Sequence, residues 1–136
     1  MRVLCYPENK KKLTAIANMI KAEYDLSVNA VDRIPSAYPC DKERIVILAT
    51  SIKGKLPDDY RLYVRELTKA RAANVAIIAA GDDACVESTK ALLTEAGTNI
   101  IDEVKKIKIG FFDNKVTDEE KADILAWVEK VKAELK

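Results

Sequence analysis

A chain of 136 residues, 49% hydrophobic and 33% charged, has the length and apolar content of one globular domain, and it is too apolar to be a disordered segment. Its formal net charge of +1 provides no strong overall field for nucleic acid or an anionic membrane, so we expect neither as a partner. The sequence contains no histidine, which argues against most hydrolases and against a metal site, because histidine is the usual general base and the commonest metal ligand.

The location of the protein and the state of its cysteines follow from simple patterns. No apolar run approaches the roughly 20 residues that cross a bilayer, and Pro7 interrupts the first apolar stretch too early for a signal peptide. We therefore expect a cytoplasmic protein. Cys5, Cys40 and Cys85 are widely spaced and odd in number, which indicates neither a disulfide framework nor a zinc site, and their simplest role is in the core.

The first third of the chain predicts three strands and one helix. Residues 1–6 are a short apolar strand, and residues 13–24 carry apolar side chains at helical spacing. Apolar and polar side chains alternate over residues 26–31, as in a half-buried strand near the edge of a sheet. Residues 44–50 form a continuous apolar run, which is typical of a central parallel strand covered on both faces.

The middle of the chain predicts a helix, a strand and a second helix. The first helix has an apolar stripe over residues 58–70. Residues 75–80 are a second fully buried strand, which ends at Gly81, and a helix over residues 84–96 stops at Gly97. The expected buried stripe of the first of these helices is Tyr60, Tyr63, Val64, Leu67 and Ala70.

The last third predicts one more strand and a closing helix. Residues 100–101 and then residues 107–112 supply the strand material. Thr117 and Glu120 have the spacing of a capping box at the start of the final helix, and Trp127 is expected to anchor packing beside its core face. The expected core face is Ile124, Leu125, Val128, Val131 and Leu135.

Strands therefore alternate with helices about five times, with no repeat or linker, which predicts one domain over residues 1–136. Parallel neighbours need right-handed crossovers, so the helices cover both faces of a Rossmann-like, three-layer α/β/α sandwich with a five-stranded parallel sheet. Ligands of such sheets bind at the carboxyl ends of the strands. The candidate loops are therefore residues 7–12, 49–56 and 80–85.

Two of these loops resemble those of flavodoxin-like proteins. Residues 45–57 contain a hydrophobic strand, a small polar turn, a glycine and a proline that opens the next helix, which is similar to the third-strand region of that family. The spacing to the strand before Gly81 also matches, as does the Phe-Phe-Asp-x-Lys turn at residues 111–115. The resemblance covers nearly the whole chain and implies strand order 2-1-3-4-5, a bound FMN and a redox partner protein.

The resemblance also implies where the FMN would lie: its phosphate in the first loop and its ring between the second and third. The chain would then be an electron carrier or a small oxidoreductase, as a monomer or homodimer, with no catalytic side chain because the flavin supplies the redox chemistry. The implied contacts are Asn9, Lys10 and Lys11 with the phosphate, Thr50, Ser51 and Gly54 along one edge of the ring, and Gly81 and Asp82 along the other.

The first loop departs from the family's Ser/Thr- and Gly-rich turn. Pro7 donates no amide, and Glu8 would repel a phosphate. Residues 10–12 are three lysines at a helix N-terminus, which either assist the helix amides in binding an anion or form a solvated face. The loops also lack the aromatic side chain that often stacks on the flavin, and the nearest aromatic candidates are Tyr6 and Tyr38.

Three other interpretations compete with flavin binding. Cys5 and Lys11 are faintly similar to the phosphate loop of low-molecular-weight tyrosine phosphatases, but the arginine of that loop is missing. A phosphoreceiver domain needs a phosphorylatable aspartate where Ala49 and Thr50 stand. The third alternative is a flavin-free module that uses the same loops for protein contact, and in it Asp82 only caps the following helix.

Overall fold

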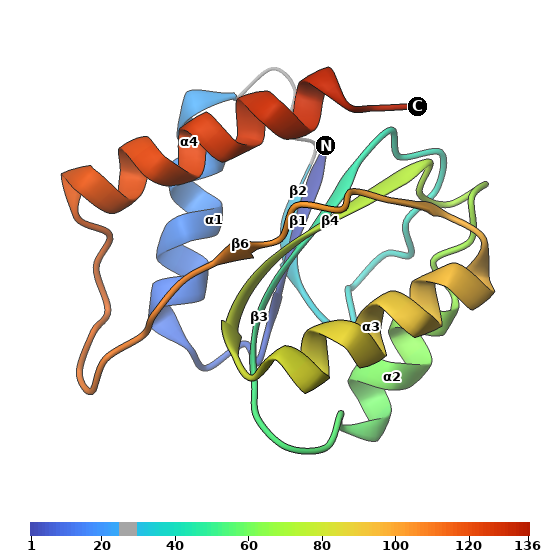
Figure 1. The fold of residues 1–136 in the computed structure, drawn as a ribbon, viewed down its shortest axis with the longest axis horizontal. Coiled ribbons are helices and arrows are strands. Elements are labelled where there is room, and N and C mark those ends of the chain that lie inside the picture. The colour runs from blue at the N-terminus through green and yellow to red at the C-terminus, as the bar shows by residue number, and fades with distance from the viewer. Residues whose placement is uncertain (25–29) are drawn as a thin grey trace.

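A parallel β-sheet organises the computed structural model, which describes residues 1–24 and 30–136 (Figure 1). Its strands lie in the order β2-β1-β3-β4-β5. Strand β6 also pairs directly with β4, nearer the carboxyl end of β4 than β5 does. This arrangement confirms the predicted α/β class and the strand order 2-1-3-4-5. The strands are β1 (Arg2–Tyr6), β2 (Ala30–Arg33), β3 (Val46–Ile52), β4 (Asn74–Gly81), β5 (Asn99–Ile100) and β6 (Lys105–Lys106).

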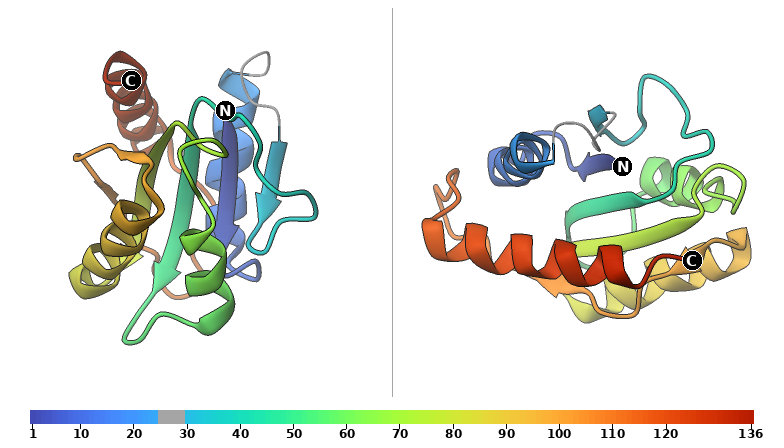
Figure 2. Two further views of the ribbon diagram at one scale, coloured as in Figure 1. Left: turned by 90° about the vertical axis from the view of Figure 1, so that its right-hand side faces the viewer. Right: turned by 90° about the horizontal axis from the view of Figure 1, so that it is seen from above.

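In the described part of the chain, four helices cover the two faces of the sheet, α1 and α4 on one side and α2 and α3 on the other (Figures 1 and 2). Successive residues of a strand point to opposite faces, so each central strand contributes to both layers. In β3, Ile47 packs on the α1/α4 side and Leu48 packs on the α2/α3 side. The helices are α1 (Lys11–Glu23), α2 (Asp58–Arg65), α3 (Asp83–Ala96) and α4 (Asp118–Ala133).

The last strand differs from its prediction, because residues 107–112 lie outside the sheet's strands and two short pieces, β5 and β6, take the place of one strand. The register gives the reason. Between the pairs Val75–Ile100 and Ile78–Lys105, β4 advances three residues while its neighbour advances five, so the neighbour must leave the ladder between them. After β6 the Ile107 amide donates to the Ala79 carbonyl at 2.9 Å, and the chain then turns away.

The end of α2 also differs from the sequence analysis. Helix α2 ends at Arg65 because the chain enters a tight turn, in which the Thr68 amide donates to the Glu66 carbonyl at 2.9 Å. Leu67 is still buried, but Ala70 is exposed, so its assignment to the buried stripe was wrong. Most of the strand expected at residues 26–31 falls on residues 25–29, which lie outside the described residues.

The N-terminus of α4 confirms the capping box. The Glu120 amide donates to Thr117 Oγ1 at 3.1 Å, and the Thr117 amide donates to Glu120 Oε1 at 3.0 Å. Trp127 is buried beside the core face, as expected, and its Nε1 donates to the Glu103 carbonyl at 2.9 Å. Within residues 1–24 and 30–136, no helix has the length and apolar content to cross a membrane.

Loss of this cap has a measurable cost. Thr117→Ala is expected to lower the free energy of unfolding by about 1 kcal/mol, because the Glu120 amide loses its acceptor. Thr117→Ser should retain most of the stability. The measurement is urea unfolding, and Thr94→Ala on the exposed side of α3 serves as the control for removing a threonine side chain. Equal stability of Thr117→Ala and wild-type protein would contradict a working cap.

Candidate ligand-binding site

A hollow of about 700 Å³ opens at the carboxyl edge of the sheet. Its lining comes from the loop after β1, from the end of β3 and the loop that follows it, from the end of β4, and from the segment that follows β6. All but the last of these lie within the ranges selected from the sequence, residues 7–12, 49–56 and 80–85. We call it the rim hollow. Its lining residues are Lys10, Ser51, Lys53, Ala80, Gly81, Ile107, Lys108, Ile109 and Gly110.

Among the described residues, the charged side chains that line the rim hollow are all positive. Lys10, Lys53 and Lys108 line it, and none of the lining residues in the described part of the chain is a carboxylate. All three lysines are exposed, so each ammonium group is free to turn toward a bound molecule. A concave surface with cations from three segments attracts an anionic ligand.

The N-terminus of α1 adds to this preference. Lys10 occupies the N-cap position without a capping side-chain hydrogen bond, and the first turn of α1 contains no acidic residue. Free helix amides at such an end can bind an anion. The repulsion expected from Glu8 is reduced, because its Oε2 lies 3.0 Å from Arg33 Nη1 in an exposed ion pair. The first loop therefore repels a phosphate less than its sequence alone indicates.

The three consecutive lysines do not share one role. Lys10 and Lys11 are exposed, but Lys12 is only 2% exposed. Its Nζ donates to Asp113 Oδ2 and to Glu120 Oε2, both at 2.6 Å. The interpretation of residues 10–12 as one solvated face is therefore wrong for Lys12, which ties α1 to the start of α4.

Strand alternation separates two neighbours that the sequence analysis placed together. Ser51 lines the rim hollow, whereas the Thr50 hydroxyl is buried and donates to the Ile78 carbonyl at 3.4 Å. Thr50 borders a much smaller cavity beside Cys85 and Thr89 of α3. The sheet extends to Ile52, so Thr50 and Ser51 are strand residues that point to opposite faces.

Asp82 and Gly54 are joined to each other on the α3 side of this edge. Asp82 Oδ2 accepts from the Gly54 amide at 2.9 Å, and Oδ1 accepts from the Cys85 amide at 3.0 Å. The Cys85 thiol donates to the Gly54 carbonyl at 3.1 Å. Contacts from the Cys85 side chain and from these amides hold the pKa of Asp82 below its usual value. Asp82 therefore caps α3 and fixes the β3–α2 loop against it.

The aromatic candidates lie away from the rim hollow. Tyr6 Oη donates to Asp59 Oδ1 at 2.7 Å, and its ring centre is 5.1 Å from that of Tyr60. Burial, together with this hydrogen bond, raises the pKa of Tyr6 to about 12. Tyr38 is 78% exposed and does not line the hollow.

The sequence analysis assigned Phe111 and Phe112 to a strand, but in the structure they form an exposed aromatic pair that directly follows a residue of the hollow in the sequence. Phe111 and Phe112 directly follow Gly110, are 90% and 85% exposed, and contact each other edge to face with ring centres 4.4 Å apart. Large exposed apolar side chains of this kind are candidates for contact with another molecule.

The structure thus brings together three of the eight residues proposed from the sequence: Lys10, Ser51 and Gly81. Asn9 and Lys11 are exposed outside the lining, and Thr50, Gly54 and Asp82 make their contacts toward the α3 side. The sequence analysis missed Lys53, although its loop was selected, and it missed residues 107–110. These last residues were assigned to a strand, so they were not considered as a loop at the carboxyl edge.

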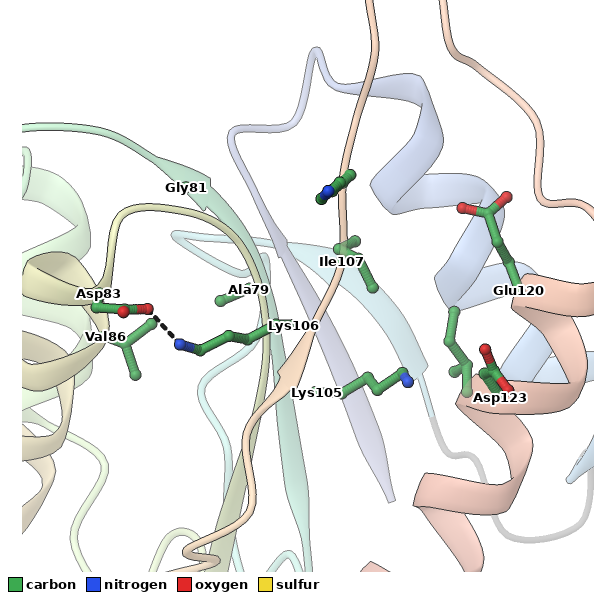
Figure 3. Close-up of a pocket in the computed structure, with 11 residues that line it drawn as sticks. Ala79, Gly81, Asp83, Val86, Lys105, Lys106, Ile107, Glu120 and Asp123 are labelled. Atoms are coloured by element: carbon green, nitrogen blue, oxygen red, sulfur yellow. Dashed lines mark hydrogen bonds and ion pairs between the residues drawn. The ribbon is translucent and has the colours of Figure 1, made fainter.

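A second hollow, of about 470 Å³, lies at the open edge of the sheet along β6 (Figure 3). We call it the edge hollow. Lysines and carboxylates both line it, and part of this charge is already paired: Lys106 contacts Asp83, and Glu120 contacts Lys12. Its charges are therefore more balanced than those of the rim hollow, which is the stronger candidate site for an anion.

Metal binding finds no support in the described part of the chain, because no group of three or more Cys, Asp or Glu side chains there could hold an ion.

Comparison with known proteins identifies the fold. No protein-family model matches the sequence, and no curated protein is detectably similar to it. Among solved structures, the chain is similar to a short-chain flavodoxin associated with a bacterial microcompartment, with a TM-score of 0.64, 16% identity and coverage of 97% of this chain and 95% of that one. It is also similar to a flavodoxin from the domain Archaea, with a TM-score of 0.60, 14% identity and coverage of 96% and 98%.

Both likenesses span nearly the full length of each chain. They confirm that the chain has a flavodoxin-like fold, as the resemblance of its loops implied. At this level of identity they show the fold alone, and the function has to be argued from the site.

Proposed function

We propose that this protein binds FMN in the rim hollow and carries electrons to or from a partner protein in the cytoplasm. The observation that carries the proposal is that the loop after β1, the carboxyl ends of β3 and β4 and the loop after β3 converge on one lysine-lined hollow of about 700 Å³ at the edge of a flavodoxin-like sheet. In open parallel sheets this edge is where ligands bind.

The residues of the hollow suit a flat molecule with an anionic group. Ala80 and Gly81 line the hollow at the end of β4, and Ser51 offers a hydroxyl on the neighbouring strand, so small residues border the position proposed for a planar ring. Lys10 and the open amides of α1 would hold the phosphate, since cations and helix N-termini both favour it. The bound flavin would supply the electron-transfer chemistry, and the protein would supply binding and electrostatic tuning.

Besides the residues that do not line the hollow, this proposal differs from the site implied by the sequence in its charge. Lys53 and Lys108 lie in the same hollow as Lys10, so cations surround the space on several sides. Negative charge gained by a ligand on reduction would be stabilised there. FMN binding would thus rest on lysines instead of on the hydroxyl-rich loop of other flavodoxins.

Removal of these charges tests the proposal. We expect purified protein to quench FMN fluorescence saturably, and Lys10→Glu or Lys108→Glu to weaken FMN binding about tenfold to a hundredfold, the loss expected for one charge-assisted contact. Riboflavin, which lacks the phosphate, should be affected much less by Lys10→Glu. Lys69→Glu, an exposed lysine outside the hollow, is the matched control.

Two results would contradict this function. Absence of any FMN quenching at protein concentrations well above micromolar would remove the electron-transfer proposal. Saturable FMN binding that survives both lysine substitutions unchanged would show that the flavin is not held in the rim hollow. Lys11→Glu adds a further comparison, because Lys11 is exposed but lies outside the lining.

A flavin-free binding module is the second candidate function, and the exposed pair Phe111 and Phe112 favours it. In that case the same edge of the sheet would contact a protein through the aromatic pair. The two functions separate experimentally, because Phe111→Ser with Phe112→Ser should leave FMN binding close to wild type while removing a contact that depends on the aromatic rings.

A further inference from the structure

Cys40 lies in a different environment from the other two cysteines. It is 3% exposed and belongs to the core on the α2/α3 side, away from the rim hollow. Its Sγ accepts a hydrogen bond from Arg2 Nη1 at 3.4 Å and lies 3.6 Å from Tyr63 Oη. A guanidinium beside a sulfur stabilises negative charge on it, and the thiolate is the nucleophilic form of cysteine.

The charge of Arg2 is only partly compensated. Arg2 is 5% exposed, and its Nη2 lies 3.7 Å from Asp32 Oδ2, which is a loose ion pair. Its buried Nε has no hydrogen-bond partner among the described residues. Buried cations are normally satisfied on all sides, so this guanidinium has unused capacity to stabilise an anion next to it.

The other two thiols have the opposite surroundings. Cys5 donates to the Leu13 carbonyl at 3.5 Å, and burial together with the charge of Asp32 raises the pKa of Cys5 to about 12. Cys85 donates to the Gly54 carbonyl at 3.1 Å, and burial together with Asp82 raises the pKa of Cys85 to about 11. Both environments favour the protonated thiol, which is the less reactive form. Cys5 and Cys85 can therefore serve as controls for the reactivity of Cys40 within the same protein.

A small molecule can reach Cys40 through a hollow of about 240 Å³. Ser36, Cys40 and Tyr63 are among its lining residues, and Ser36 Oγ is hydrogen-bonded to Tyr63 Oη at 2.7 Å. The hollow is thus lined by a thiol and two hydroxyl groups, and the buried guanidinium that donates to the thiol lies outside the lining. Glu66 also lines the hollow, and its Oε2 lies 3.7 Å from Nη1 of Arg71, another lining residue. A cation beside the sulfur and access from a hollow are typical of a reactive cysteine, whereas a cysteine that serves only in core packing needs neither.

We propose that Cys40 is a peroxide-reactive thiol and a site of reversible oxidation, separate from the rim hollow. The Cys40 thiolate sulfur attacks one oxygen of hydrogen peroxide, an S–O bond forms and the O–O bond breaks. The sulfur loses two electrons to the peroxide, and the departing hydroxide takes a proton from solvent and leaves as water. The product is Cys40 sulfenic acid, which a thiol can return to the reduced state through a disulfide.

The test compares the three cysteines of the reduced, full-length protein. Hydrogen peroxide is added with dimedone, which traps sulfenic acid, and the labelled peptides are quantified by mass spectrometry over time. We expect labelling at Cys40, with Cys5 and Cys85 at least tenfold slower, and loss of this difference in urea. Arg2→Met should slow Cys40 labelling at pH 7 several-fold, and Arg2→Lys should restore part of the rate by returning a cation.

The exposed Arg61→Met is the matched control and should label as wild type does. Labelling of Cys5 or Cys85 as fast as Cys40 in folded protein would overturn the proposal, and so would an unchanged Cys40 rate in a folded Arg2→Met variant. Where Arg2→Met does not fold, the comparison within wild-type protein still decides, because it needs no substitution.

Discussion

Lys12→Met is expected to lower the free energy of unfolding by roughly 3 kcal/mol. Lys12 Nζ lies 2.6 Å from both Asp113 Oδ2 and Glu120 Oε2, and its side chain is 3% exposed. Removal of the ammonium leaves the carboxylates of Asp113 and Glu120 without the cation from α1 that they share. Each carboxylate side chain is about one-third exposed, so water limits the loss to the lower end of the range for buried pairs.

The neighbouring residue provides the control for this substitution. Lys11→Met removes the same charge one residue earlier, but Lys11 is exposed, and its loss should stay within about 0.5 kcal/mol. Urea unfolding of the two variants at pH 7 measures the difference. Equal stability of the two proteins would show that the Lys12 contacts do not contribute to folding.

The pH dependence of stability gives an independent measure of the same cluster. Hydrogen bonding with Lys12 is the main cause that holds the pKa of Asp113 and the pKa of Glu120 below their ordinary values. Each carboxyl therefore adds stability above its unfolded pKa of about 4 and loses it as the pH falls through the lower folded value. The stability gap between wild type and Lys12→Met should shrink as the pH falls below about 4.

This cluster also connects the fold to the proposed site. The Gly110 amide donates to Asp113 Oδ2 at 3.3 Å, the oxygen that Lys12 contacts, and Gly110 lines the rim hollow. Lys12 thus helps to fix the position of Gly110, which lines the rim hollow, through their shared contact with Asp113. If FMN binds there, Lys12→Met should weaken its binding as well, although Lys12 itself does not line the hollow.

Much of the fold could be predicted from the sequence, because apolar runs and helix caps depend on residues that are close together in the chain. The continuous apolar runs of β3 and β4 indicate strands buried on both faces, and the capping box at Thr117 marks the start of α4. The split between β5 and β6 could not be predicted, because it depends on a register with β4 that only the paired strands define.

The candidate site was harder to predict, because it depends on which way each side chain points. Lys12 and Ile16 are four residues apart on one face of α1, so the burial of Ile16 indicates the same for Lys12, whereas composition alone treats three lysines alike. The predicted strand ended at Thr50 and left Ser51 in the loop, so the alternation that separates these two residues applies only once β3 is known to reach Ile52. The ranges selected from the sequence therefore do contribute to one hollow, but the sequence did not indicate which of their residues line it.

Gly81→Ala is expected to lower the free energy of unfolding by about 3 kcal/mol or more, for two reasons that add. The φ angle of Gly81 is +138°, a conformation that side chains rarely adopt, and a Cβ built there would lie 2.2 Å from the Ile52 carbonyl oxygen. Gly81 is paired with Ile52 at the end of the β3–β4 ladder, so the clash can be relieved only by separating two strands that border the rim hollow.

Gly54→Ala separates these two causes. Gly54 also has a positive φ, +77°, but a Cβ there would meet no atom within 4 Å, so its loss should be only about 1 kcal/mol. Urea unfolding of both variants measures the difference, and similar losses would mean that β3 and β4 can move apart at little cost. A much larger loss for Gly81→Ala would show that the close approach of the two strands is fixed. Gly81 would then be required for the packing of β4 against β3 at the edge of the sheet where the rim hollow opens.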